Sequence, residues 1–268
     1  MKDIKIIFVD IDWTIYDHKH KRFDKRSIIA LKHLQKKGIK VIISTSRPLH
    51  SVYQLGVFDL FTPDGFITMN GGYIVINNKE IYEYRFPKDK LHEICDVITS
   101  FDLTMELSTK DDRFLIKEKN DYVDLLFQTF KEEMPPVKPF TNEDVITALL
   151  FAPKKLDKKI KRLLPEGIEY FRFAEYGVDI IAKPHLKGGA VNKVLDYLKL
   201  DKSQAMAFGD DYADISMFEN VQYGIALNNG KKEVKDAASF ITKEVWKSGV
   251  YRALKHYHLL NLFDFCLF

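Results

Sequence analysis

Short runs of apolar residues alternate with a stretch of helical periodicity in the first part of the chain. The run at residues 4–9, Ile-Lys-Ile-Ile-Phe-Val, is apolar enough to be a strand buried on both faces. A helix is predicted over residues 24–37, where apolar residues fall on one face and Gly38 stands at the C-terminal cap. A second buried strand is predicted over residues 39–43. A strand, a helix and a strand within about thirty residues form a βαβ unit, which favours a parallel sheet with a right-handed crossover.

The same pattern continues after this unit and returns near the end of the chain. A third strand is predicted at residues 66–69, and a helix at residues 188–199 has its apolar residues on one face. Further buried strands are predicted at residues 205–208 and 223–226. We therefore expect an α/β fold whose core is a Rossmann-like parallel sheet.

The middle of the chain has a different texture from about Ile81 onward. Helical stretches at residues 88–100 and 154–164 mix with an alternating, strand-like segment at residues 113–117. This mixture is typical of a separate α+β domain inserted into the parallel sheet. The predicted organisation is a first core part at residues 1–81, an inserted α+β domain at residues 82–183, and a second core part at residues 184–268.

Two carboxylates follow the first predicted strand directly. Asp10 and Asp12 are one residue apart, so their side chains leave an extended chain on the same face. Two like charges held this close destabilise each other unless a cation lies between them or one of them is protonated. The pair therefore indicates a metal ion or a reaction that needs two carboxyl groups.

Polar residues also follow the other predicted strands. Thr45 ends the second strand, and Asp210 ends the strand at 205–208, with Asp214 shortly after it. Because sites in open parallel sheets form beyond the carboxyl ends of the strands, we expect these groups to gather with the first acidic pair. Lys187, at the start of a helix, is the expected cation of the site, and Arg47 is expected to be a salt-bridge partner. Carboxylates with few histidines suit Mg²⁺ better than zinc, and the full set describes phosphoryl transfer.

Four motifs in this order resemble a known family. They are DIDWT at residues 10–14, STSR at 44–47, KGG at 187–189 and GDDYAD at 209–214. The chain resembles the haloacid dehalogenase superfamily, and within it the Cof-type phosphatases with a large type II cap. The resemblance covers essentially the whole chain, and each motif stands at a predicted strand or helix end. It implies a Mg²⁺-dependent phosphatase whose inserted cap closes over the site, excludes water and recognises the leaving group.

The resemblance also implies a catalytic role for several residues. Asp10 would be the nucleophile that forms an aspartyl phosphate, and Asp12 would be the general acid and then the base that activates water. Thr45 would hydrogen-bond the phosphoryl group, and Lys187 would neutralise its charge and that of Asp10. Sugar phosphates are the leading substrate class among small phosphomonoesters.

The metal site is implied in the same way. Mg²⁺ would be held by the carboxylate of Asp10, the backbone carbonyl of Asp12 and the carboxylate of Asp210. Asp214 would lie outside this set and orient the groups that surround the metal.

Three positions depart from the pattern of the family. Trp13 replaces the usual glycine between Asp12 and Thr14, Ser46 replaces the glycine after Thr45, and Ala213 replaces the asparagine before the last aspartate. An indole at position 13 would narrow the entrance, and the loss of the amide at position 213 removes a polar contact. These departures keep an alternative open, namely a weakly active or inactive protein of this fold that binds a ligand or regulates a partner.

Composition and charge limit the class of protein. The chain has 268 residues, of which 46% are hydrophobic, with a net charge of +3. This charge is too small to indicate a nucleic-acid binder, and the lysine-rich run within residues 154–162 predicts the solvated face of an amphipathic helix. We expect a small phosphorylated metabolite as the partner, with no nucleic acid and no membrane. The oligomeric state stays open.

The two ends of the chain and the cysteines suggest a location. Asp10 and Asp12 interrupt the apolar run near the N-terminus, so no signal peptide is expected, and no run is long enough to span a bilayer. Cys95 and Cys266 match no zinc spacing and suit a reducing compartment, so we expect a cytoplasmic protein.

The apolar end, residues 259–268, is expected to pack on the core, with a dimer contact as the alternative.

Overall fold

The computed structural model describes residues 3–130, 133–182 and 187–260, and its chain divides into two compact units. The core unit consists of Met1–Arg47, Leu55–Tyr82 and Leu186–Phe268, and the inserted unit consists of Pro48–Gln54 and Glu83–His185. The short segment Pro48–Gln54 therefore groups with the inserted unit, whereas the sequence predicts it as part of the first core part. The second boundary expected for the insertion, at residues 183–184, and most of the apolar end, residues 261–268, lie outside the described residues.

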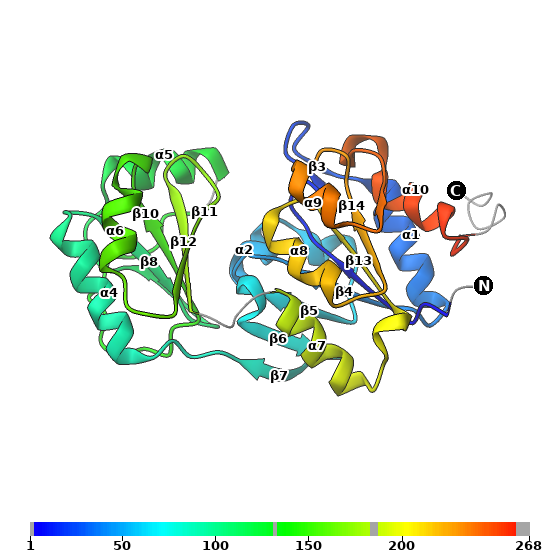
Figure 1. Ribbon diagram of the computed structural model, residues 1–268, viewed down its shortest axis with the longest axis horizontal. Coiled ribbons are helices and arrows are strands. Elements are labelled where there is room, and N and C mark those ends of the chain that lie inside the picture. Colours follow the sequence, from blue (N-terminus) through cyan, green and yellow to red (C-terminus); the bar gives the residue numbers. More distant parts are fainter. Residues whose placement is uncertain (1–2, 131–132, 183–186, 261–268) are drawn as a thin grey trace. The chain divides into compact units, whose positions relative to one another are not determined.

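An eight-stranded sheet forms the centre of the core unit (Figure 1). Its strands, in spatial order, are β15 (Phe240–Ile241), β14 (Tyr223–Ala226), β13 (Ala205–Gly209), β1 (Ile6–Val9), β4 (Lys40–Ser44), β5 (Gly65–Thr68), β6 (Tyr73–Ile76) and β7 (Lys79–Glu83). The neighbours from β15 to β5 pair in parallel, and β6 pairs antiparallel with β5. The predicted α/β fold with a mostly parallel core is thus confirmed.

Helices cover both faces of this sheet. Every residue of β1 is therefore buried, as its continuous apolar run predicts. The helices of the core unit are α1 (Lys25–Lys36), α3 (Val57–Leu60), α7 (Lys187–Leu198), α8 (Tyr212–Glu219), α9 (Lys232–Ala237) and α10 (Gly249–His256). Helix α1 begins after Asp24, whose side chain accepts a hydrogen bond from the backbone of Arg26. It ends at Lys36, and Gly38 follows with a φ of 84°, in the left-handed conformation that favours glycine.

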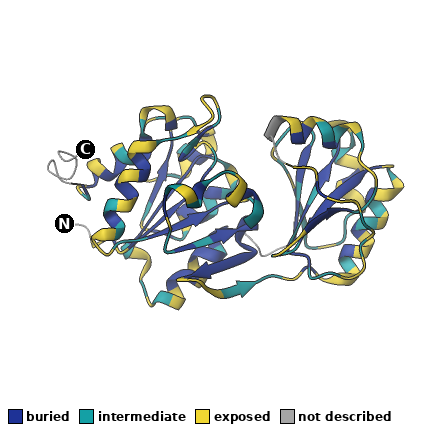
Figure 2. Cartoon of the chain, turned by 180° about the vertical axis from the view of Figure 1, so that it is seen from behind, coloured by how far each residue is buried: buried dark blue, intermediate teal, exposed yellow. Residues whose placement is uncertain are grey.

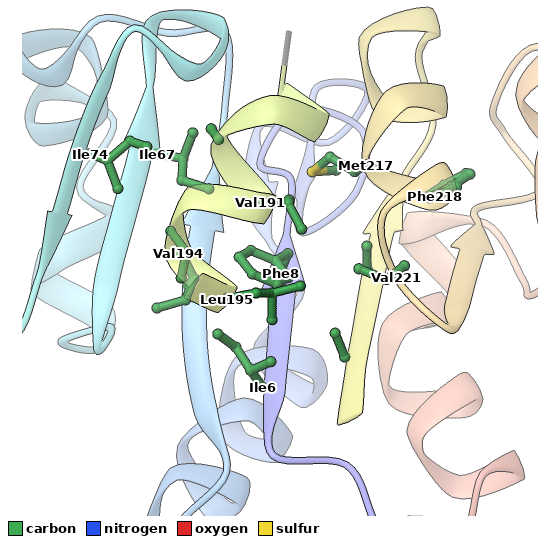
Figure 3. Packing of buried hydrophobic residues seen from close by; sticks show 14 of the residues in the cluster. Ile6, Phe8, Ile67, Ile74, Val191, Val194, Leu195, Met217, Phe218 and Val221 are labelled. Atoms are coloured by element: carbon green, nitrogen blue, oxygen red, sulfur yellow. The ribbon is translucent and has the colours of Figure 1, made fainter. Parts of the chain in front are cut away.

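Figure 3 shows how the helix that opens the second core part packs on the sheet. Val191, Val194 and Leu195 of α7 lie over Ile6 and Phe8 of β1, and all five side chains are buried. Helix α8 contributes to the same cluster through Met217 and Phe218. Its packing against α7 and β13 holds the starts of both helices near the carboxyl end of the strand.

The inserted unit has an antiparallel sheet of its own. The spatial order of its strands is β11 (Ile168–Arg172), β12 (Gly177–Ala182), β10 (Thr147–Phe151), β8 (Thr104–Ser108) and β9 (Arg113–Leu115). Its helices are α2 (Leu49–Gln54), α4 (Lys88–Ser100), α5 (Asp121–Phe130) and α6 (Asp157–Leu163). Apolar residues of α4 and α6 pack with Met105 and Leu107, while α5 packs with Leu115 and Phe151. The expected separate α+β insertion is therefore an antiparallel sheet with helices on its two faces, and its strands are largely buried (Figure 2).

Two local features differ from the sequence analysis or add to it. The helix predicted over 154–164 is a 3₁₀ turn at Lys154–Leu156 followed by α6. A small hairpin, β2 (Tyr16–Asp17) and β3 (Arg22–Phe23), follows the first acidic pair. Among the described residues, no helix has the length and apolarity that crossing a membrane requires.

The packing of α7 predicts the effect of a truncation in the core. Leu195→Ala should lower the free energy of unfolding by roughly 2–5 kcal/mol, because it removes buried apolar atoms and leaves a cavity. The neighbouring exposed residue gives a matched control, and Asp196→Ala should change the free energy by less than about 0.5 kcal/mol. Urea unfolding followed by circular dichroism measures both. Equal effects of the two substitutions would contradict the assigned orientation of α7.

Candidate active site

The candidate residues at strand and helix ends come together at one edge of the core sheet. Asp10 follows β1, Thr45 follows β4, and Asp210 follows β13. Lys187 is the first residue of α7, and Asp214 lies in the first turn of α8. All five side chains are buried. The parallel sheet accounts for this gathering, since the carboxyl ends of its central strands meet at the same edge.

The ammonium group of Lys187 is the centre of the site. Its Nζ donates hydrogen bonds to Asp10 Oδ1 and to Asp214 Oδ1, each at 2.7 Å, and its side chain is 2% exposed. Burial by itself lowers the pKa of Lys187, but the charges of Asp10 and Asp214 outweigh burial and raise it above its ordinary value. The lysine is therefore a permanent buried cation that joins two carboxylates from different elements.

The position of Asp214 is set by the backbone as well as by the lysine. Its Oδ2 accepts hydrogen bonds from the backbone N–H groups of Asp210, at 2.9 Å, and Asp211, at 3.1 Å. A side chain at position 209 has no room here, because a Cβ on Gly209 would lie 2.3 Å from Asp214 Cγ. The glycine of the GDDYAD motif thus permits the close approach of helix α8 to the end of β13.

The surroundings of Asp10 and Asp210 disfavour the charged forms of their carboxyl groups. Burial raises the pKa of Asp10 to about 8, with Lys187 opposing the shift and Asp214 and Asp12 adding to it. Burial, together with the charges of Asp10 and Asp214, also raises the pKa of Asp210 well above its ordinary value. Thr14 Oγ1 donates to Asp210 Oδ1 at 3.3 Å. An additional cation in the site would restore the charged form of both acids.

These carboxylates could hold a metal ion. One oxygen from each of Asp10, Asp210 and Asp214 lies within 4.8 Å of the others. Counting Asp12, the site has four carboxylates and two cations, Lys187 and Arg47, so two negative charges are in excess when all four acids are ionised. Carboxylate oxygens and a deficit of two positive charges fit Mg²⁺, a hard divalent cation.

Asp12 has a different environment from Asp10. Arg47 donates from Nε to Oδ2 and from NH2 to Oδ1, both at 2.8 Å, and His18 Nε2 lies 2.5 Å from Oδ1. Burial by itself raises the pKa of Asp12, but Arg47 and His18 outweigh burial and hold it well below its usual range. The prediction that Arg47 is a salt-bridge partner is confirmed. The contact of His18 was missed, since only the fold of the β2–β3 hairpin returns that residue to Asp12.

Thr45 is held in a tight turn at the end of β4. Its backbone N–H donates to the carbonyl of Ile67 at 2.9 Å, and its Oγ1 accepts from the backbone N–H of Arg47 at 3.1 Å. A hydroxyl that accepts one hydrogen bond still has its proton to donate. Thr45 is thus oriented by the backbone and has a donor to offer to an anion.

The three departures from the family pattern have different surroundings. Trp13 has a φ of 58°, so the backbone at this position adopts the left-handed conformation that favours the glycine it replaces. Ser46 is exposed, and Ala213 is the second residue of α8, with a side chain that offers no polar atom. The loop at position 13 therefore has a bulky residue in a backbone conformation that favours glycine.

Comparisons with known proteins agree with this arrangement. A sequence profile described as haloacid dehalogenase-like hydrolase matches residues 7–254. YkrA of Bacillus subtilis strain 168 is 29% identical over 97% of this chain and 100% of its own length. Phosphoglycolate phosphatase 1 of Saccharolobus solfataricus is 26% identical over 92% of each chain. The structure of the phosphatase BT1666 from Bacteroides thetaiotaomicron aligns with a TM-score of 0.86, at 25% identity and 96% coverage of both chains. The resemblance inferred from the four motifs is confirmed.

The contacts of Lys187 predict a pH-dependent loss of stability. Lys187→Met leaves Asp10 and Asp214 without their shared cation, so the free energy of unfolding should fall by roughly 3–5 kcal/mol when the carboxylates are charged. The folded-state pKa of Asp10, about 8, lies above its unfolded value, so stability falls as the pH rises toward that value. Without the lysine this pKa rises further. Below about pH 8 Asp10 is protonated in both folded proteins, so stability falls with pH at the same rate in each. The difference in stability should therefore widen above about pH 8, where Asp10 ionises in the wild type but stays protonated in the variant.

Urea unfolding of metal-free protein at several pH values measures this difference. Lys193→Met, at an exposed position on the same helix, is the matched control and should change stability by less than about 1 kcal/mol at every pH. A constant difference between Lys187→Met and the wild type across the pH range would contradict the assigned ion pairs.

Proposed function

Because the chain belongs to the haloacid dehalogenase-like hydrolases and is a phosphatase of that family, we propose that its reaction depends on Mg²⁺. Its proposed substrates are small phosphomonoesters, with sugar phosphates as the leading class. The reaction would pass through an aspartyl phosphate. The observation that carries the proposal is the buried set of Asp10, Lys187 and Asp214 beside Asp210, with its excess of negative charge. A purely structural ion pair would not require this excess of negative charge, because uncompensated buried charge is unfavourable.

In this proposal Asp10 is the nucleophile. An oxygen of Asp10 forms the new bond to phosphorus while the bond between phosphorus and the ester oxygen breaks. Lys187, 2.7 Å from Asp10, compensates the negative charge on the carboxylate and on the incoming phosphoryl oxygens. The hydroxyl of Thr45 donates to the phosphoryl group. When bound, Mg²⁺ adds positive charge for the same oxygens.

Asp12 is proposed as the proton donor to the leaving oxygen. It then takes a proton from the water that hydrolyses the aspartyl phosphate and releases inorganic phosphate. In the structure Asp12 is paired with Arg47, and this pairing favours the charged form. The dianionic phosphate of a substrate competes for the guanidinium group, and an opened pair would leave Asp12 able to hold a proton.

The metal ligands remain part of the proposal. The carboxylates of Asp10 and Asp210 and the backbone carbonyl of Asp12 are the proposed set. Both oxygens of Asp214 accept hydrogen bonds from N–H donors, which supports its proposed role as a residue that orients the site rather than a direct ligand. The antiparallel inserted unit is the cap that the resemblance implies, with residues 82–183 as its proposed extent.

A protein that binds a ligand without turnover is the second candidate. Ala213 lacks the amide of the family, and the tight Arg47–Asp12 pair removes the general acid while it persists. This candidate predicts binding of Mg²⁺ or phosphate with no release of phosphate above the background of an Asp10→Asn variant.

Phosphate release from a panel of esters separates the two candidates. With sugar phosphates, nucleotides and p-nitrophenyl phosphate, the wild type should release phosphate with Mg²⁺ and lose this activity in EDTA. Asp10→Asn should lower kcat by roughly 10³-fold or more, because it removes the nucleophile. Asp196→Asn, at an exposed position on α7, is the matched control and should keep full activity. Release that is equal in the wild type and Asp10→Asn would contradict the phosphatase proposal, and Ala213→Asn would then test whether the missing amide is the cause.

A further inference from the structure

Trp13 is an unusual residue for its position beside Asp12. It is one of two tryptophans in the chain, and its side chain is large and apolar, yet the residue is 37% exposed. Its φ of 58° is rare for a bulky residue and costs free energy that a glycine would not incur. Strain of this kind persists only where the surrounding structure holds it, and it is concentrated at functional sites.

The backbone of Trp13 is held from both sides. Its N–H donates to the carbonyl of Tyr16 at 2.8 Å, and its carbonyl accepts from Asn229 Nδ2 at 2.8 Å. Asn229 Oδ1 in turn accepts from the backbone N–H of Val245 at 2.9 Å. Two segments far apart in the sequence thus fix the conformation that directs the indole.

The indole contacts the imidazole that is paired with Asp12. Its ring centroid is 5.1 Å from that of His18 in a tilted contact, and His18 Nε2 is 2.5 Å from Asp12 Oδ1. The ring of Tyr16 contacts the same imidazole edge-on at 4.8 Å and restricts its movement. Trp13, His18 and Asp12 therefore form a continuous surface within the core unit.

We propose that Trp13 is a specificity-determining residue that contacts a ring in the leaving group of the substrate. This inference rests on the proposed function, in which Asp12 protonates the leaving oxygen. The atoms bonded to that oxygen then pass along the surface of His18 and Trp13. An indole presents a large flat apolar face with a single N–H donor.

The chemistry of the indole selects a class of ester. A ring with a flat apolar face, either the C–H face of a cyclic sugar or an aromatic ring, buries apolar area against the indole. An acyclic polyol offers little flat surface and loses rotational freedom when it is ordered. The structure therefore favours phosphomonoesters of ring-bearing alcohols over those of acyclic alcohols.

Three esters test this preference, namely phenyl phosphate, glucose 6-phosphate and glycerol 3-phosphate. Trp13→Gly should lower kcat/KM for at least one of the two ring esters by roughly tenfold relative to glycerol 3-phosphate. The ester that loses the activity identifies the ring as aromatic or as a sugar. Trp13→Phe keeps a flat ring and should retain most of the preference, and Trp246→Phe, the matched control at the other tryptophan, should leave it unchanged. Equal changes for all three esters, or no change, would overturn the proposal.

A binding measurement separates this proposal from the phosphatase activity. In an Asp10→Asn/Trp246→Phe variant, Trp13 is the one remaining tryptophan, so its fluorescence reports contact without turnover. In Mg²⁺, phenyl phosphate or glucose 6-phosphate should change the emission saturably, and glycerol 3-phosphate should not. Absence of Asp10-dependent hydrolysis would refute the phosphatase proposal alone. Absence of a fluorescence change with both ring esters would refute the role of Trp13.

Discussion

The site depends on one buried ammonium group placed between two carboxylates. Lys187 is 2% exposed and lies 2.7 Å from an oxygen of Asp10 and 2.7 Å from an oxygen of Asp214. A charge this deeply buried is tolerated only with close partners of opposite sign. The lysine therefore constrains the end of β1, the start of α7 and the first turn of α8 to meet at one point. The remaining acids are added to this arrangement without further buried cations of their own, apart from the Arg47 pair of Asp12.

The same constraint explains the tight packing around the site. Gly209 lets Asp214 approach the end of β13, and Gly188 lets α7 approach α8, because a Cβ there would lie 2.2 Å from the carbonyl of Ser216. The GDDYAD and KGG motifs thus serve the geometry of the lysine as well as the chemistry. Because the packing at these two glycines leaves no room for a Cβ, the charged groups are held in place before a substrate binds. Such preorganised charges are what stabilises a transition state electrostatically.

Much of this organisation could be predicted from the sequence. Continuous apolar runs indicated buried parallel strands, and the rule that sites form at their carboxyl ends placed Asp10, Thr45 and Asp210 together. The contact of His18 with Asp12 and the left-handed backbone of Trp13 could not be predicted, since both depend on a short hairpin and on Asn229 from a distant segment. The grouping of Pro48–Gln54 with the inserted unit is likewise a matter of tertiary contact, which no local pattern records.

When all four acids of the site are ionised, the site has two more negative charges than its cations compensate, and one divalent ion would balance them. Isothermal titration of metal-free protein with Mg²⁺, in buffers of different ionisation enthalpy, measures both the stoichiometry and the protons exchanged. One Mg²⁺ should bind per chain. Protons should be released at neutral pH, because burial raises the pKa values of Asp10 and Asp210, and the share that comes from Asp10 should diminish above about pH 8. Absence of binding, or binding with no proton release at neutral pH, would contradict the proposed metal site.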